Sequence, residues 1–232
     1  MKKTLSFGLL LSALICAPSV FAQSPPPFPA PNQIAPKITF VVTGRDFEKY
    51  PTPKRKTPQN KNRIEVLYFY YIGSPWASEI DQKLRNWVAT RPYEMSFTSV
   101  PIYFEGQQAG IFGARIHYAL VKLGEDDRLI PLLMQAIRQG RVNLARSESV
   151  ISWMESHGVP RSEFLQALNA PSTKFQTTSI PFAMDDYNIK SSPTIVIDGK
   201  YRIESSETLP PAKTLAIAQF MTDKLSLGGP AP

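Results

Sequence analysis

The stretch from Val66 to Ala77 decides the fold. An apolar strand sequence, VLYFYY at 66–71, passes within three residues into Ser74-Pro75-Trp76-Ala77. Serine followed by proline is typical of a helix start, in which the serine side chain caps a backbone N–H and proline takes the first helical position. The residues that follow carry one apolar stripe at helical spacing, made by Ile80, Leu84, Trp87 and Val88. The stretch therefore predicts a buried strand that leads into an amphipathic helix packed on a sheet.

The N-terminus has the pattern of a secretory signal. Met1-Lys2-Lys3 is followed by an apolar run from Leu5 to Ile15 and by the cleavage box Val20-Phe21-Ala22. We expect residues 1–22 to be a signal peptide that is cleaved after Ala22, which would deliver the mature chain to the periplasm. Lipidation at Cys16 is the alternative, but the residue before it is Ile15, where such a site normally has a small residue.

Cysteine usage limits the chemistry. Cys16 is the only cysteine in the 232 residues, so the chain after Ala22 has no thiol. Disulfide exchange needs a thiolate that attacks through a mixed disulfide. The mature chain is therefore predicted to be redox-inactive, and no disulfide can contribute to its stability.

The composition favours a globular protein that folds without disulfide bonds. Hydrophobic residues make up 43% of the chain, which is enough to bury a core over about 200 residues. The formal net charge is +7, and much of it lies between Lys54 and Lys61, a segment we expect to be solvated. No apolar run after the signal is long enough for a transmembrane segment, and nothing indicates a nucleic-acid surface.

The order of expected elements indicates an α/β fold. A Pro-rich flexible leader at 23–37 comes first, and residues 227–232 form a flexible tail. Strands are expected at Ile38–Thr43, Ile64–Tyr71 and Met95–Phe104, followed after Gly110 by helices that end at Gly124, Gly140, Gly158 and Pro171. A hairpin is expected from Ser192–Ile197 through Asp198-Gly199 to Tyr201–Ile203, and a last helix carries Ile217, Phe220, Met221 and Leu225.

This order resembles the DsbA family of periplasmic thiol:disulfide oxidoreductases, whose thioredoxin fold is interrupted by an all-helical domain. The resemblance rests on 66–70 (VLYFY), 118–126 (YALVKLGED), 130–133 (IPLL) and 192–201 (SPTIVIDGKY), and it covers roughly residues 38 to 225. It implies a thioredoxin-fold domain in two parts, 38–108 and 176–226, with a helical insertion at 109–175. In that family the helix start holds C-x-x-C, but here both sulfur positions are filled, by Ser74 and Ala77.

The resemblance also implies a binding site. Pro193 aligns with a cis-proline that faces the active-site turn, which would expose the backbone of Ser192 to an extended substrate chain. The plainer interpretation is that Pro193 only begins a strand. We expect Ser74, Pro75, Trp76 and Ala77 to be degenerate active-site positions without catalytic function. Substrate contacts are expected from Trp76, Ser192, Pro193 and Thr194.

Ser74 has a second interpretation besides helix capping. Kappa-class glutathione transferases share the inserted fold, and their turn also begins Ser-Pro, with the serine hydroxyl bound to the thiolate of glutathione. The segment 204–208 (ESSET) lacks the acidic-arginine pair with which those enzymes hold glutathione, so no cofactor is expected. The two histidines are far apart in sequence and lack other ligands at metal-binding spacing, so no metal is expected. His157 is expected to contact the last carbonyls of its helix.

The sequence thus predicts a periplasmic, redox-inactive module that binds peptides or proteins, with a chaperone-like or assembly-associated role. Unfolded or extended clients would be the partners, and Trp76 would offer them an amphipathic face. The alternatives are a glutathione-dependent transferase or isomerase that uses Ser74, and a structural subunit of an envelope complex that uses its helical face or basic loop.

Overall fold

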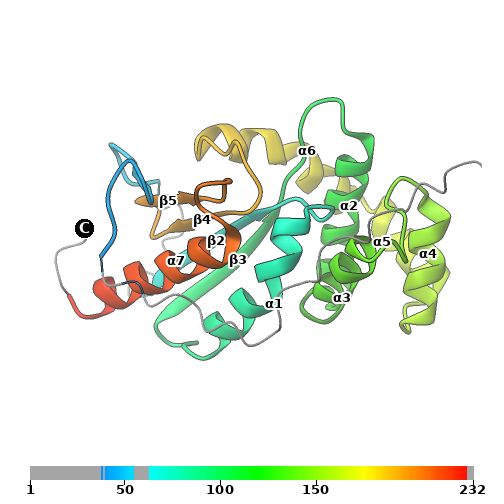
Figure 1. Ribbon diagram of the computed structural model, residues 1–232. Coiled ribbons are helices and arrows are strands. Elements are labelled where there is room, and N and C mark those ends of the chain that lie inside the picture. Colours follow the sequence, from blue (N-terminus) through cyan, green and yellow to red (C-terminus); the bar gives the residue numbers. More distant parts are fainter. Residues whose placement is uncertain (1–37, 39, 55–62, 229–232) are drawn as a thin grey trace, which may run out of the picture. The chain divides into compact units, whose positions relative to one another are not determined.

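The computed structural model describes residues 38, 40–54 and 63–228 (Figure 1). The predicted signal peptide, the leader at 23–37 and most of the basic segment 54–61 lie outside the described residues. No helix within the described part of the chain is long and apolar enough to cross a membrane.

A five-stranded sheet has the order β1-β5-β4-β2-β3. Its strands are β1 (Glu48–Lys49), β2 (Ile64–Tyr70), β3 (Met95–Pro101), β4 (Thr194–Ile197) and β5 (Tyr201–Glu204). β2 and β3 run parallel, as expected when a helix connects them, whereas β4 is antiparallel to both β2 and β5. In the hairpin, Asp198 and Gly199 both have positive φ and Lys200 N donates to Ile197 O, the pattern of a type I′ turn.

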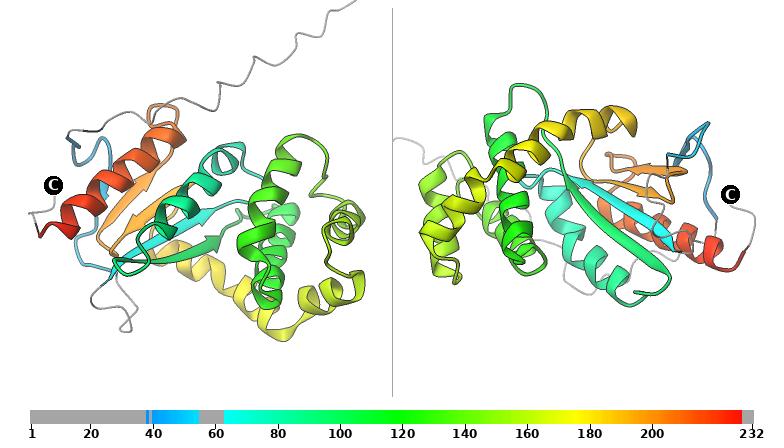
Figure 2. Two further views of the ribbon diagram at one scale, coloured as in Figure 1. Left: turned by 90° about the horizontal axis from the view of Figure 1, so that it is seen from below. Right: turned by 180° about the vertical axis from the view of Figure 1, so that it is seen from behind.

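Side chains of β2 alternate between the two faces of the sheet. Val66, Tyr68 and Tyr70 pack into the larger core beneath α1 (Pro75–Ala89) and α7 (Pro211–Ser226), whereas Leu67 and Phe69 pack toward α6 (Pro171–Asp186). Figure 2 shows α1 and α7 on one side of the sheet and α6 on the other. Both faces are covered, which explains why β2 is apolar at nearly every position.

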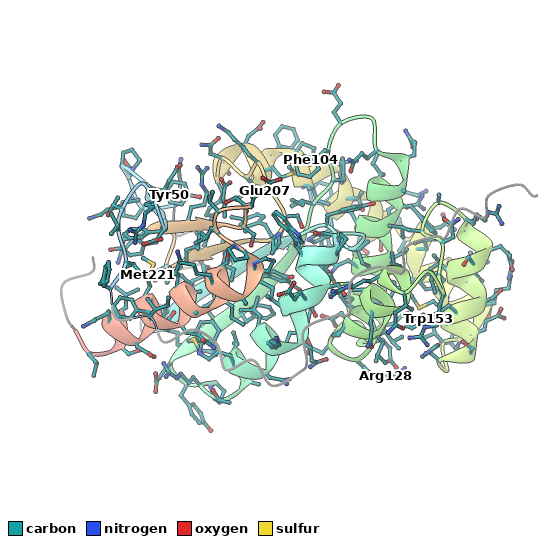
Figure 3. All side chains as sticks on the ribbon, in the orientation of Figure 1. Tyr50, Phe104, Arg128, Trp153, Glu207 and Met221 are labelled. Atoms are coloured by element: carbon teal, nitrogen blue, oxygen red, sulfur yellow. The ribbon has the colours of Figure 1, made fainter. Side chains whose placement is uncertain are left out.

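A helical block lies between β3 and β4 in the chain. It contains α2 (Gln108–Leu123), α3 (Asp126–Arg138), α4 (Ser147–Ser156), α5 (Arg161–Asn169) and α6. Gly124, Gly140 and Gly158 have positive φ just after α2, α3 and α4, so the predicted glycine terminators are confirmed. Figure 3 shows the packed side chains, with Met221 of α7 on the sheet side and Trp153 of α4 in the block.

Some expected boundaries differ from the structure. The helix that carries Phe164 and Leu168, α5, ends at Asn169 before Pro171, as predicted, but Pro171 then occupies the first turn of a further helix, α6, where its missing N–H costs nothing. Because α6 continues to Asp186, the boundary expected between 175 and 176 falls inside this helix. The third expected strand also stops earlier than predicted, at Pro101 rather than Phe104.

The strand expected at Ile38–Thr43 is also absent among the described residues of that range. Thr43 makes only an isolated bridge with Phe47 across a turn at Gly44, and the edge strand is β1 instead. The cause is the buried Asp46 carboxylate, which accepts the backbone N–H of Val42 and pairs with Arg45. These contacts, the Arg45 hydrogen bond first, lower the pKa of Asp46 to about 2.

Candidate functional site

The start of α1 has the geometry of a capped helix. Ser74 is the N-cap, with extended backbone at φ −76° and ψ 122°, and its Oγ accepts a hydrogen bond of 3.2 Å from Ala77 N. Pro75 stands at the first helical position, as predicted. Ser74 N also donates to Tyr71 O at 2.9 Å, which fixes the turn between β2 and the helix. The positive end of the helix dipole therefore points at the Ser74 side chain.

The loop before β4 lies against this turn. The Ser192–Pro193 peptide bond is cis, the form expected from the sequence. Ser192 Oγ accepts the backbone N–H of Tyr71 at 2.7 Å, and Ser74 Oγ donates toward Ser192 O at a long 3.4 Å. The turn at Ser74 and the loop at Ser192, which are 118 positions apart in the sequence, therefore lie in contact. We call this contact the Ser74–Ser192 junction.

The predicted site residues differ in what they offer to solvent. Trp76 is 38% exposed and Pro75 is also exposed, whereas Ala77 is fully buried. Pro193 is buried, and its carbonyl accepts the N–H of Ser205.

Thr194 does not fit the expected substrate contact. It is fully buried and paired with both Phe69 and Glu204, and its hydroxyl donates to Ser191 O at 2.9 Å. Its hydroxyl and its backbone therefore form contacts within the protein and are not exposed to a substrate. Among the predicted residues, the surface of the junction is therefore formed by Ser74, Pro75, Trp76 and Ser192.

A buried polar layer beneath the junction was not foreseen. Tyr68 donates to Ala77 O at 3.2 Å and stacks on Tyr70, whose hydroxyl lies 2.7 Å from Nδ1 of His117. Burial lowers the pKa of His117 to about 3, so its ring is neutral at physiological pH. Burial also raises the pKa of both tyrosines.

An ion pair lies in the same layer. Arg85 Nε donates to Asp81 Oδ2 at 3.0 Å, one helical turn away, and Arg85 Nη1 donates to Asp127 Oδ1 at 2.7 Å. Burial raises the pKa of Asp81, and the opposing effect of Arg85 only partly offsets it. The available sequence signal was the i,i+4 spacing of Asp81 and Arg85, each next to a residue of the apolar stripe.

The histidines stand apart in the structure as well. His117 is enclosed in the core, whereas Nδ1 of His157 contacts Trp153 O at 2.7 Å near the end of α4, as predicted. At the junction, a serine hydroxyl at a helix N-terminus can exchange hydrogen bonds with a ligand. It cannot replace a thiolate in disulfide exchange.

The sheet order, the helical block and the helix start facing a cis-proline define a thioredoxin fold with a helical insertion. Two relatives named thiol:disulfide interchange protein DsbA share 26% identity with this chain. The one from Burkholderia cepacia matches over 226 residues, 97% of this chain and 98% of that protein. The one from Azotobacter vinelandii matches over 216 residues, 93% of this chain and 96% of that protein.

Solved structures agree on the fold. DsbA from Pseudomonas aeruginosa has a TM-score of 0.70 at 21% identity, over 81% of this chain and 96% of that one. The oxidoreductase DsbA from Xylella fastidiosa has a TM-score of 0.69 at 23% identity, over 81% of this chain and 98% of that one. No protein-family model matches the chain. The chain is therefore a DsbA-like thioredoxin-fold protein, in a variant without the C-x-x-C cysteines.

Proposed function

We propose that this protein is a periplasmic, redox-inactive binding module that holds unfolded or extended protein segments at the Ser74–Ser192 junction. The observation that carries the proposal is the exposed indole of Trp76, which is held on a rigid helix start beside positions that carry no sulfur. An aromatic ring with a polar N–H suits contact with apolar and polar parts of a client chain. The relatives named for thiol:disulfide interchange support a protein client.

The location rests on the first 22 residues. Their charged start, apolar run and cleavage box support export through a signal peptide, and they support a mature chain without cysteine. A chaperone-like or assembly-associated role follows, because binding without chemistry can delay the aggregation of a client or deliver it to a partner.

The test uses the mature protein and a permanently unfolded client, reduced and carboxymethylated α-lactalbumin. Replacing Trp76 by Ala should weaken binding at least fivefold, measured by fluorescence anisotropy of the labelled client. The matched control is Phe182→Ala, which removes another exposed aromatic side chain from α6 and should leave the affinity unchanged. Equal affinity for the wild type and Trp76→Ala would exclude the junction as the client site.

The same preparation discriminates the alternatives. Glutathione at millimolar concentration should not raise the melting temperature, whereas a rise abolished by Ser74→Ala would favour the transferase, because a ligand stabilises the fold to which it binds. Failure to bind any unfolded client, together with no response to glutathione, would favour the structural subunit.

A further inference from the structure

The outer edge of the sheet at β3 has backbone groups that pair with no strand among the described residues. Ile64 N donates to Glu94 O at one end of the β2–β3 ladder, and Ile102 N donates to Tyr70 O at the other. In the parallel ladder between these two bonds, Ser96, Thr98 and Val100 direct their N–H and C=O groups toward β2. The same groups of Phe97 and Ser99 must then point away from the sheet, where no other strand of the described structure pairs with β3.

A pocket of about 680 Å³ lies at this edge. Its floor includes Phe97, Thr98 and Ser99 of β3, and its walls come from α1, α2, α3 and α6. Figure 2 shows β3 at the border of the sheet, with α1 and α6 on opposite sides of it. The two residues with outward-facing backbone groups therefore lie in a recess rather than on an open surface.

Arg85 lines this recess with its charge already paired. The side chain is 8% exposed, and its Nε and Nη1 are bonded to carboxylates. Its guanidinium carbon lies 5.6 Å from the centre of the Phe97 ring, so Arg85 packs over a residue of β3. These contacts hold the planar guanidinium in one orientation.

The charges around the pocket favour a cation over an anion. The charge of Arg85 is already balanced by Asp81 and Asp127, and the half-buried Asp126 adds another carboxylate to the wall. Burial raises the pKa of Asp126, so this carboxylate is poorly solvated and would gain from a positive neighbour. An anionic ligand would face the carboxylates of Asp126 and Asp127.

We propose that the β3-edge pocket binds an extended peptide segment as an added strand, with a Lys or Arg side chain of that segment directed to Asp126 and Asp127. Backbone groups of the peptide pair with those of Phe97 and Ser99. Strand addition at a sheet edge supplies affinity through main-chain bonds and specificity through side-chain pockets. This site is separate from the Ser74–Ser192 junction and does not depend on the function proposed for it.

The test measures the binding of a fluorescent, end-blocked octapeptide of alternating valine and threonine with one central lysine. Ser99→Pro is the decisive variant, because it removes an outward N–H but keeps the ladder to β2, and proline is tolerated on edge strands with that N–H facing outward. We expect at least a tenfold loss of affinity, with a far-UV spectrum like that of the wild type. Phe182→Ala is the control, because Phe182 is exposed and does not line this pocket, and it should bind the peptide as the wild type does.

Two further arms keep the proposal falsifiable if Ser99→Pro fails to fold. A peptide with N-methyl groups on alternate residues should bind the wild type at least tenfold more weakly. Asp126→Asn combined with Asp127→Asn should weaken the lysine peptide but not a matched glutamine peptide.

Equal binding of the methylated peptide, or of a glutamate peptide, would overturn the proposal. So would self-association of the protein that Ser99→Pro abolishes, because a second copy would then occupy the edge. If peptide binding is absent while Trp76-dependent client binding persists, the β3 site is refuted and the junction stands.

Discussion

At the scale of single residues, the start of α1 rests on polar groups that are buried and paired. His117 accepts or donates one hydrogen bond with the Tyr70 hydroxyl and is 2% exposed. A neutral imidazole is tolerated there, but a charged one would need solvent that the core does not supply. The folded protein therefore resists protonation of His117, and this resistance links its stability to pH.

The first prediction concerns this linkage. The pKa of His117 is about 3 in the folded chain against 6.5 for an unperturbed histidine, so the unfolded state binds the proton first as the pH falls. The contribution of neutral, buried His117 to the free energy of unfolding is therefore complete above pH 6.5 and is lost as the pH falls toward 3. The free energy of unfolding should fall by about 3 kcal/mol between pH 7 and pH 4 through this group.

Replacement of His117 by Phe removes the titrating group and keeps a ring in the core. Urea unfolding at pH 7 and pH 4 should show a smaller pH effect in His117→Phe than in the wild type by about that amount. The variant loses the partner of Tyr70 at both pH values, so only the difference between the two pH values is informative. Identical pH dependence in both proteins would show that His117 is not buried neutral.

At the scale of elements, α1 begins where Ser74 caps it and the cap joins the helix to the loop before β4. A helix start leaves several N–H groups without intrahelical partners, and Ser74 Oγ accepts one of them, from Ala77. The structural role of Ser74 therefore does not depend on any ligand at the junction.

The second prediction follows from this cap. Ser74→Ala should lower the free energy of unfolding by about 1 kcal/mol, because the N–H of Ala77 loses its acceptor. Ser74→Asp should retain most of the stability, since its carboxylate can accept the same N–H and suits the positive end of the helix dipole. Urea unfolding at pH 7 of the two variants and the wild type gives the comparison. A loss in Ser74→Asp as large as that in Ser74→Ala would contradict the capping role.

The elements that the sequence predicts well are those governed by local rules. The strand at 64–70, the Ser-Pro helix start and the glycine terminators each follow from a few adjacent residues, and the structure has them. The errors arise where distant contacts decide. The Asp46 carboxylate binds the backbone N–H of Val42 across the turn at 44–46, a contact that no apolar pattern reports. Pro171 follows the predicted end of α5 but also begins α6, and the sequence pattern showed only the first of these roles.

The same division applies to the candidate site. The meeting of Ser74 with Ser192 could be predicted only from the family resemblance, because 118 positions separate the two residues. The burial of Thr194 and the Asp81–Arg85 pair depend on how the sheet and α1 pack, which periodicity does not report. The free edge of β3 likewise required the strand order.

At the scale of the whole molecule, the thioredoxin fold with its helical insertion forms without a cysteine at position 74 or 77. The core is continuous from the sheet through α1 and α7 into the helical block, so a disulfide at the turn is not needed to hold it. What the turn retains is its geometry: a side-chain atom at position 74 that accepts a helix N–H, and a second position one turn later in the core.

The last prediction tests whether this geometry still supports thiol chemistry. Ser74→Cys combined with Ala77→Cys should form an intramolecular disulfide on mild oxidation, because the two positions have the C-x-x-C spacing at a helix start. After reduction, the thiol at position 74 should have a pKa of about 7.5 or lower rather than the usual 8.5, because the helix N-terminus stabilises its thiolate. The rate of iodoacetamide alkylation as a function of pH measures this value. The matched control is Ser156→Cys, at the last residue of α4, where the helix dipole disfavours a thiolate. An ordinary pKa at position 74 would mean that the helix N-terminus does not stabilise a thiolate there, whereas a depressed pKa would show that the turn keeps this electrostatic property without a sulfur atom at position 74 or 77.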